Sequence, residues 1–494
     1  MPPGYDKLDG QFIISITFQP CPQGWRQWQL DGIFLNIAEQ TRVVRVADAT
    51  GREVGLLLGT AVDLERGMII DDQYSLGSSL ENRPDLDAVI ERDIYRLAGS
   101  FLFIVSACDA HRIYLDANGT LSVVYDRERE LAGATAAALL DPASYEARFR
   151  GKLYKTLDVD NAGWFTAGLT AHEGISRLLC NHYLDLENWT VKRHWPLAAI
   201  ETAKDPTAAC LRICKRISET TAILAKAGKT SVALTAGNDS RLLLACSRDM
   251  IRDLSFVTVA APTADIDVAC ATRLARLVGL QHKVLPYREA TSAEADLWRL
   301  RAGHCVGGNN VKMHPSVKPL EGQYFIGGLG GEVGRGFLWL NAEHNTVIDA
   351  KGLVNRLKLP PSADVVSAVE EWLAPISHFD SFFILDLAYL ELRMSAWGFC
   401  DSYVKPGHCE IHPMISRENY TDMLSLPPEV RRKGTIYSKA IAALWQEISE
   451  IPVNKYGNYR DILRPAKEAI RNPKRASRKI MQIVGTWKSR RAHT

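Results

Sequence analysis

The sequence predicts an α/β protein in which a β-rich N-terminal part is followed by a parallel sheet with helical crossovers. Short runs of β-branched and aromatic residues, such as GQFIISITF and SFLFIVSA, fill roughly the first 150 residues. From about residue 205, apolar runs of strand length alternate with patterns of helical period. This alternation predicts parallel strands joined by right-handed crossovers. After about residue 345 the patterns are mostly helical.

Two further runs in the N-terminal part, VGLLLG and RIYLDANGTLSVVYD, have the composition of strands. Asn118-Gly119 divides the second run, and this dipeptide is typical of the tight turn of a β-hairpin. We therefore expect a hairpin centred on this pair.

The alternating part begins with a predicted helix, KDPTAACLRICKRISETTAIL, which has Asp205 as its cap and Pro206 at its first position. Its apolar stripe consists of Cys210, Ile213, Cys214, Ile217 and Leu224. The predicted helix is followed by a strand over 231–234, a helix from about Ser240 and the strand LSFVTVA. Next come the helix IDVACATRLARLVG, closed by Gly279, and the strand HKVLP. FFILDLAYLELRMSAWGFC predicts one buried core helix.

Composition excludes several classes of protein. The 494 residues predict two or three domains, and a net charge of +2 gives the whole chain no attraction to nucleic acid. From Arg464 onward, ten Lys or Arg residues accompany a single acidic residue, Glu468. This basic tail is interpreted either as a solvated, frayed end or as a weak contact with a membrane surface. The start lacks a signal-peptide pattern, and no apolar run reaches the ~18 residues of a spanning helix, so we expect a cytoplasmic protein.

The ten cysteines are scattered, which favours a reducing compartment over a disulfide scaffold. Two groups have a superficial similarity to metal sites: Cys210 with Cys214, and His408 and Cys409 with His412. Neither group has a matching second pair, so we interpret them as buried thiols and a histidine with satisfied hydrogen bonds.

The segment SVALTAGNDSRLLLA, residues 231–245, contains the turn that predicts the chemistry. Small residues between a strand and a helix let backbone N–H groups approach an anion, and the helix N-terminus adds a favourable dipole. The hydroxyls of Thr235 and Ser240 add donors, and Asp239 can cap the helix or bind a magnesium ion carried by a nucleotide. We therefore predict a phosphate site; the alternative interpretation is a capped turn without a ligand.

Two other phosphate loops are excluded. AKAGKTS ends like a Walker loop, but Ile223 stands at the position of its first glycine and the segment precedes a strand. A dinucleotide fingerprint needs three spaced glycines after the strand, and Gly237 is alone.

Thr235 to Ser240 resembles SGGxDS, the PP-loop of the ATP pyrophosphatases. QYFIGGLGGEVGRG resembles the asparagine synthetase segment LSGEGSDELFGGY, and the stretch from HPMISRENYTDMLSLPPEV to NKYG resembles the C-terminal part of the same family. LAGSFLFIVSACDAHRIYLDANGTLSVVYD resembles its glutaminase domain. The chain thus resembles the asparagine synthetase-like amide-forming enzymes, with three synthetase segments in order over some 220 residues.

This resemblance implies an N-terminal α+β Ntn-hydrolase-like sandwich, a parallel-sheet PP-loop domain and a helical C-terminal part. The corresponding boundaries are 1–200 for a degenerate glutaminase-like domain, 201–463 for the synthetase-like domain and 464–494 for the basic tail. It also implies that ATP activates a carboxylate as an acyl-adenylate, that pyrophosphate leaves, and that a nitrogen nucleophile displaces AMP.

The resemblance also assigns residues. Lys455 in NKYG occupies the position of the catalytic lysine, Asp239 and Glu332 would bind Mg²⁺, and Asp267 lies at a position that is often acidic. The residues assigned to ATP and pyrophosphate are Leu234, Thr235, Gly237, Asn238, Asp239, Ser240, Gly328 and Gly330.

Three departures from the family pattern are visible. Ala236 replaces a glycine, which would cost on the order of 1 kcal/mol if the position needs a positive φ. Leu329 stands where asparagine synthetases have a glutamate, and a leucine cannot act as a base. The chain begins Met1-Pro2-Pro3, and its first cysteine, Cys21, precedes a proline, so we expect no glutaminase activity.

Ammonia, a partner's glutaminase or an amine on the substrate would then supply the nitrogen. Aspartate, a peptide carboxylate, a β-amino acid and a sugar acid remain open as the carboxylate, and similarity to the polysaccharide-linked members favours a sugar acid. The alternative hypothesis is a catalytically inactive nucleotide-binding scaffold or regulator, which Ala236, Leu329 and the missing cysteine would suit.

Overall fold

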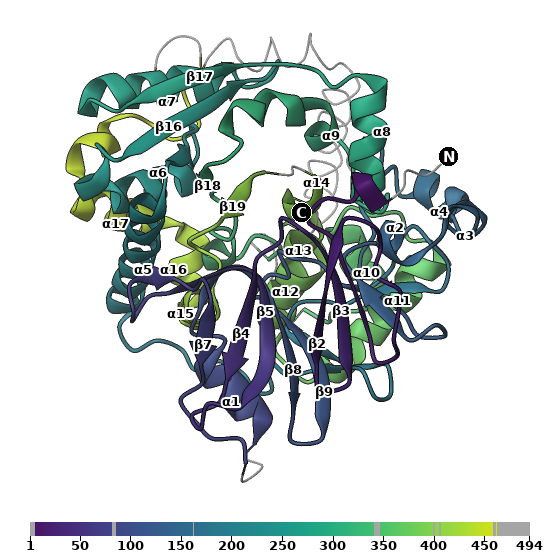
Figure 1. Cartoon of the computed structure of the whole chain (residues 1–494). Coiled ribbons are helices and arrows are strands. Elements are labelled where there is room, and N and C mark those ends of the chain that lie inside the picture. Colours follow the sequence, from purple (N-terminus) through teal and green to yellow (C-terminus); the bar gives the residue numbers. More distant parts are fainter. Residues whose placement is uncertain are drawn as a thin grey trace.

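The computed structural model describes residues 5–81, 85–161, 163–339, 346–398, 401–404, 407–457 and 461. It is a mixed α/β protein with several sheets, one of which is parallel, as the sequence predicts. Figure 1 shows the antiparallel sheets below and the parallel sheet above them. Within these ranges, no helix has both the length and the hydropathy that crossing a bilayer requires. The basic tail that begins at Arg464 lies outside the described residues.

The N-terminal part contains a six-stranded antiparallel sheet and an eight-stranded sheet, in which only β4 and β7 pair in parallel. The first sheet has the order β12 (Ile175–Arg177), β10 (Val124–Asp126), β11 (Leu131–Gly133), β1 (Phe12–Ser15), β3 (Ile33–Ala38), β2 (Trp25–Leu30). The second has the order β14 (Thr190–Arg193), β13 (His182–Asp185), β9 (Ala110–Leu115), β8 (Ala98–Ala107), β5 (Glu53–Asp63), β4 (Val43–Ala47), β7 (Gln73–Ser75), with β6 (Met68–Ile69) beside β5.

The two sheets form a sandwich because alternate residues of β5 and β8 point to opposite faces. Leu56 and Leu102 belong to the core that these strands share with β1 and β3. Leu57 and Phe103 point the other way, into a second core that α1 (Leu86–Asp93) covers. All ten residues of β8 are buried, since both of its faces are covered.

The predicted hairpin at Asn118-Gly119 is wrong. β9, before this pair, lies in the eight-stranded sheet, and β10, after it, lies in the six-stranded sheet. The buried Asp116 carboxylate determines this path, because it accepts N–H bonds from Phe101, Asn118 and Thr120 at 2.9 to 3.3 Å. Gly119 still has the positive φ of a turn, +67°. The turn therefore carries the chain from one sheet to the other.

The parallel sheet has the order β17 (His282–Pro286), β16 (Leu254–Ala260), β15 (Thr230–Ala233), β18 (Tyr324–Ile326), β19 (Cys409–Ile411). Every neighbouring pair in it is parallel, as predicted. The chain moves outward in one direction from β15 to β17 and then returns to the other side of β15 with β18. The order therefore reverses between β15 and β18, and a ligand-binding crevice is expected outside the carboxyl ends of these two strands.

Local signals place the first helices where the sequence predicts them. α5 (Pro206–Ala227) starts at Asp205, whose side chain accepts N–H bonds from Thr207 and Ala208. Its predicted stripe is buried. α7 (Asp265–Val278) ends at Gly279, which has φ +70°.

The remaining helices cover the sheets and form the C-terminal part. Those in the first half of the chain are α2 (Ala136–Leu139), α3 (Pro142–Ala147), α4 (Gly151–Thr156) and α6 (Asn238–Cys246). Those after β17 are α8 (Ser292–Arg301), α9 (Asn309–Met313), α10 (Ala350–Arg356), α11 (Ala363–Leu373), α12 (Ser381–Ala388), α13 (Ser395–Gly398), α14 (Asp401–Val404), α15 (Arg417–Ser425), α16 (Pro428–Lys433) and α17 (Thr435–Leu444).

The predicted core helix of residues 382–400 is described up to residue 398, with 399 and 400 outside the described residues, and it differs from the prediction in one respect. A π-helical turn, η6 (Tyr389–Met394), separates α12 from α13. Such turns cannot be seen in an apolar pattern, because the inserted residue changes the hydrogen bonding and not the composition.

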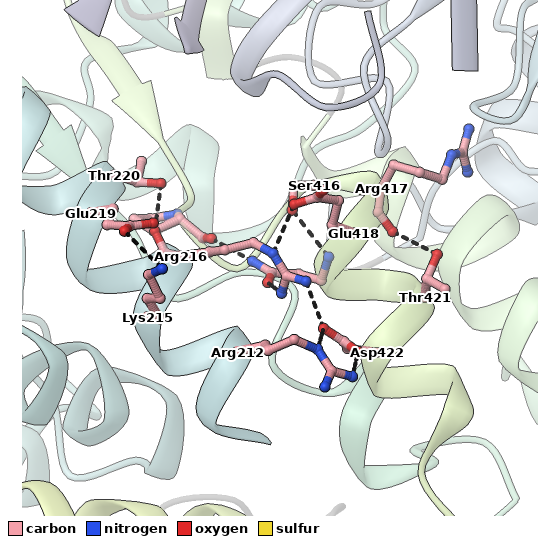
Figure 2. A network of polar contacts seen from close by, with 12 residues as sticks. Arg212, Lys215, Arg216, Glu219, Thr220, Ser416, Arg417, Glu418, Thr421 and Asp422 are labelled. Atoms are coloured by element: carbon pink, nitrogen blue, oxygen red, sulfur yellow. Dashed lines mark hydrogen bonds and ion pairs between the residues drawn. The ribbon is translucent and has the colours of Figure 1, made fainter. Parts of the chain in front are cut away.

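Arginine–carboxylate pairs hold α5 against α15, as Figure 2 shows. Arg216 contacts Asp422 at 2.6 Å and Glu418 at 2.8 Å. Arg212 contacts the other oxygen of Asp422 at 2.5 Å. α15 is thereby fixed beside the helix that leads into β15.

Candidate functional site

The turn between β15 and α6 lies at the carboxyl end of β15 and is closed by its own hydroxyls. The Thr235 N–H donates to Ser240 Oγ at 3.1 Å, and the two side-chain oxygens are 2.8 Å apart. The Gly237 N–H donates to Thr235 Oγ1 at 3.2 Å. These bonds hold the turn in a compact shape, with Asn238 at the start of α6.

α6 begins earlier than the predicted start near Ser240, since Gly237 is its cap. The prediction that Asp239 caps the helix is therefore wrong, because Asp239 lies inside the first turn. Its carboxylate instead projects to the neighbouring glycine-rich segment, where Arg335 binds it. This leaves the second of the two predicted roles, cation binding, open to Asp239.

Ala236 fits the turn without a left-handed backbone, because it is absent from the positions with positive φ. Its N–H donates to Asp267 Oδ1 at 2.8 Å, and its carbonyl accepts the Asn454 N–H at 2.9 Å. The strain considered for this alanine is thus not present. Leu234, just before it, is buried, and its N–H donates to the Val257 carbonyl at 2.9 Å.

The carboxylates of Asp239 and Glu332 both lie near the Arg335 guanidinium, in the segments that follow β15 and β18. Arg335 Nη2 lies 2.7 Å from Asp239 Oδ2 and 3.9 Å from Glu332 Oε1. The other two oxygens, Asp239 Oδ1 and Glu332 Oε2, are buried and have no hydrogen-bond partner among the described residues. Burial raises the pKa of Asp239 to about 7, with the Arg335 charge opposing the rise and the Glu332 charge adding to it.

The glycines after β18 make this approach possible. A Cβ atom at Gly331 would overlap Asp239 Oδ1, and one at Gly328 would lie 3.4 Å from the Asp239 Cβ. Gly330 has φ +105°, which a residue with a side chain rarely adopts. The predicted glycine-rich turn after a strand is confirmed, and its lack of side chains brings Glu332 to the start of α6.

These two carboxylates fit a magnesium ion. Mg²⁺ prefers hard oxygen ligands and is commonly held by one or two carboxylates together with phosphate oxygens. Asp239 and Glu332 supply buried oxygens whose hydrogen-bonding capacity is unused. An unsatisfied buried carboxylate oxygen is costly, so a cation at this place would remove a penalty that the fold otherwise bears.

Lys455 lies on a segment that is bound to the same turn. Besides the bond from Asn454, the Lys455 carbonyl accepts from the Cys270 thiol at 3.2 Å, and the Tyr456 carbonyl accepts from Arg273 at 2.7 Å. Arg241 in α6 donates to the Ile451 carbonyl. The Lys455 side chain itself is exposed, and it makes no ion pair with any residue that the structure describes.

Arg335 and Arg241 contribute to this site and were not predicted. Arg335 follows Glu332 by three residues, a spacing that places both side chains on one face of a helix. This spacing from an expected metal ligand is the sequence feature that could have identified Arg335. Arg241 directly follows Ser240, but nothing local shows that it is buried. Leu329, one of the departures from the family pattern, is partly buried and packs against the apolar core that includes Val232 of β15 and Ile326 of β18.

The superficial metal motifs form no site. No group of three or more metal-ligating side chains occurs among the described residues. Cys210 and Cys214 are buried free thiols, as interpreted. His412 is also buried, but among the described residues neither of its ring nitrogens has a hydrogen-bond partner, so the interpretation of satisfied hydrogen bonds does not hold for this histidine. The Glu410 carboxylate lies near this ring, with its Oε1 atom 3.7 Å from His412 Nε2.

No protein-family model matches the chain, and no curated protein matches it either. Two solved structures are similar at a low level. Glutamine phosphoribosylpyrophosphate amidotransferase from B. subtilis, complexed with ADP and GMP, is 11% identical over 67% of this chain and 72% of that chain, with a TM-score of 0.20. A structure described as the allosteric regulatory enzyme of purine biosynthesis is 10% identical over 73% of each chain, also with a TM-score of 0.20. Superpositions this loose carry no argument about this chain.

Proposed function

We propose that this protein is an ATP-dependent, AMP-forming amide ligase of the asparagine synthetase type. The observation that carries the proposal is the pair of half-buried carboxylates, Asp239 and Glu332, each with one buried oxygen that has no hydrogen-bond partner among the described residues. They lie at the point where the strand order of the parallel sheet reverses. In sheets of this kind ligands bind outside the carboxyl ends of the strands, at such a point. The resemblance of the three sequence segments adds the reaction type.

ATP would be held by the turn after β15 and by the glycines after β18. Backbone N–H groups of Gly237 and Asn238 at the start of α6 suit an anion, since the helix dipole is positive there. Thr235 and Ser240 would add hydroxyls once their mutual bond opens. Leu234, Gly328 and Gly330 would shape the crevice by their backbone.

Magnesium bound with the nucleotide would neutralise charge on the departing pyrophosphate, and Asp239 and Glu332 would hold it. Lys455, which makes no ion pair with the described residues and is attached to the same turn by its neighbour Asn454, would reach the phosphate where charge develops. Removing one such preorganised donor typically lowers kcat by about 10²–10³-fold.

The nitrogen donor would be ammonia, an amine or the product of a partner's glutaminase. Cys21 is exposed in the segment between β1 and β2, and Pro22 follows it. It therefore has no resemblance to a nucleophile whose own α-amine serves as the base. On this proposal residues 1–200 form a glutaminase-like domain without glutaminase activity, and residues 201–463 form the ligase domain.

The acid is proposed to be a carboxylate of the sugar-acid class, with aspartate as the second choice. Leu329 provides no base next to the expected acyl-adenylate. A nitrogen donor that is already deprotonated, such as a neutral amine, therefore fits this site better than ammonium, which would need a base to remove its proton.

Exchange of labelled pyrophosphate into ATP tests the proposal with the full chain, Mg²⁺ and a panel of carboxylates. We expect exchange that requires one class of acid, and a loss of about 10²-fold or more in Lys455→Ala. Lys439→Ala, which changes an exposed lysine of α17, is the matched control. ATP binding without exchange for any acid would instead support the nucleotide-binding scaffold.

A further inference from the structure

Arg335 sits where a cation would be expected between the two candidate metal ligands. Its Nη2 contacts Asp239 at 2.7 Å and lies 3.9 Å from Glu332. A guanidinium is always protonated in proteins, so its charge balances part of the charge of this acidic pair. The Arg335 side chain keeps 26% of its surface exposed, so it is held at the edge of the crevice and not in the core.

The same guanidinium has an unused donor. Arg335 Nε is buried and has no hydrogen-bond partner in the part of the chain that the structure describes. A planar guanidinium presents its donors as a fork that matches the oxygens of a phosphate. A phosphate can therefore accept more of the Arg335 hydrogen bonds than Asp239 does. Asp239 likewise has one oxygen bound to Arg335 and another without a partner. Both groups are therefore incompletely satisfied in the contact that they make with each other.

We propose that Arg335 is a resident cation that holds Asp239 until a nucleotide arrives and then transfers its hydrogen bonds to the phosphates. In this arrangement the free protein binds a divalent cation poorly, because the guanidinium repels it and occupies Asp239 Oδ2. A nucleotide draws Arg335 away, and Asp239 becomes available to the metal that the nucleotide carries. Arg335 is thus a positioning residue that couples metal binding to phosphate binding, and this inference rests on the proposed nucleotide site.

The arrangement predicts opposite effects of one substitution on two ligands. Arg335→Gln removes the charge and keeps a polar side chain, so binding of a metal alone should strengthen by about 10-fold. Binding of ATP should weaken by about 10-fold or more, since the phosphates lose a charged donor. A residue with a merely structural role would weaken both.

The probe for the metal is Mn²⁺ alone, measured by electron paramagnetic resonance with the full chain and without nucleotide. ATP binding is measured separately by calorimetry in the presence of Mg²⁺. Arg288→Gln is the matched control, because Arg288 also pairs with a glutamate, Glu294, but on an exposed surface. Asp239→Asn should lose most of the Mn²⁺ binding, both alone and combined with Arg335→Gln. Thermal unfolding of each variant establishes that it is folded.

The outcomes separate this inference from the ligase proposal. Tighter Mn²⁺ with weaker ATP in Arg335→Gln supports it, even if no acid gives pyrophosphate exchange. Unchanged or weaker Mn²⁺ binding in a folded Arg335→Gln overturns it, even if the wild-type protein is an active ligase. Mn²⁺ binding that survives Asp239→Asn would also overturn it, because the ion would then lie elsewhere.

Discussion

The carboxylate of Glu391 accepts two parallel hydrogen bonds from Arg193, each 2.7 Å long. Glu391 lies in the π-helical turn η6, and Arg193 ends β14 of the eight-stranded sheet. Asn181 and the Trp372 indole donate to the same carboxylate at 2.9 and 2.7 Å. Burial would raise the pKa of Glu391, but the Arg193 charge and these bonds hold it below its ordinary value.

We predict that Glu391→Ala destabilises the protein by about 3–5 kcal/mol, because it leaves the Arg193 charge buried without its partner. Urea denaturation measures the change. Asp71→Ala is the comparison, since Asp71 forms a similarly short pair with Arg42 but is 62% exposed. Its loss should change the free energy of unfolding by at most about 1 kcal/mol. Equal effects of the two substitutions would contradict the role of burial.

Two glycine substitutions should separate the shape of the candidate site from its backbone donors. Gly331→Ala would place a methyl group on Asp239 Oδ1, so it should displace that carboxylate and its bond to Arg335. Gly237 has φ −77°, and a Cβ there would lie 3.4 Å from Thr235 Oγ1, so Gly237→Ala should fold normally. In the Arg335→Gln background, where Mn²⁺ should bind more tightly, we expect Gly331→Ala to lose Mn²⁺ binding and Gly237→Ala to keep it.

Gly237→Ala should nevertheless weaken ATP binding, by about 10-fold or more, if phosphate approaches the backbone of this turn. Calorimetry with ATP and Mg²⁺ measures this effect. Unaltered ATP affinity would place the phosphates away from the turn after β15. Taken with the Mn²⁺ result, the pair of variants locates the metal and the phosphates independently.

Signals that act within a few residues were sufficient to predict much of the fold. Asp205 and Pro206 start α5, and Gly279 ends α7, because caps depend on local hydrogen bonds and on φ. Asn118-Gly119 was misleading because a turn signal does not say which sheet its flanking strands join. Burial of the Asp116 carboxylate decided that question.

The candidate site could be predicted only in part for a similar reason. Asp239 was found from its own segment, because it follows a strand and a small-residue turn, whereas Glu332 was assigned through the resemblance of its segment to asparagine synthetases. Arg335 was missed because its contact with Asp239 exists only when β18 lies beside β15. The order of the strands in the sheet places β18 beside β15, and no single stretch of the sequence specifies that order.

Acid should destabilise the protein through buried histidines. Burial lowers the pKa of His172 from 6.5 to about 3, with the nearby His304 adding to the effect. Burial likewise lowers the pKa of His304 to about 4. The unfolded chain therefore binds more protons than the folded chain below pH 6.5, so stability is present above that pH and is lost as the pH falls.

From pH 6.5 to pH 5 the loss from His172 should be about 2 kcal/mol. His172→Phe should reduce the slope of stability against pH, since a phenyl ring can keep the tilted ring contact with Tyr145, whose centroid is 4.0 Å from that of His172. Urea denaturation at several pH values measures the slope. A slope identical to that of the wild type would show that His172 binds its proton as readily in the folded protein as in the unfolded chain.

Arg241 should hold the Lys455 segment in place. It is 1% exposed, and its one hydrogen bond among the described residues runs to the Ile451 carbonyl. Burial lowers the pKa of its guanidinium, and Nε and Nη2 have no partner. Arg241→Met would keep the apolar packing of α6 but release this carbonyl, leaving the segment attached by fewer bonds.

We therefore expect Arg241→Met to speed hydrogen exchange at the Asn454 amide, which bonds to Ala236, by about 10-fold or more. Amides of β15 should exchange at their original rates, because the substitution leaves the sheet intact. Mass spectrometry of the peptide over residues 446–457 measures the first effect, and the peptide over 230–236 serves as its control. Faster exchange in both peptides would mean that Arg241 stabilises α6 itself. Pyrophosphate exchange in this variant should fall together with the protection at Asn454, because a loosened segment no longer holds Lys455 at the turn.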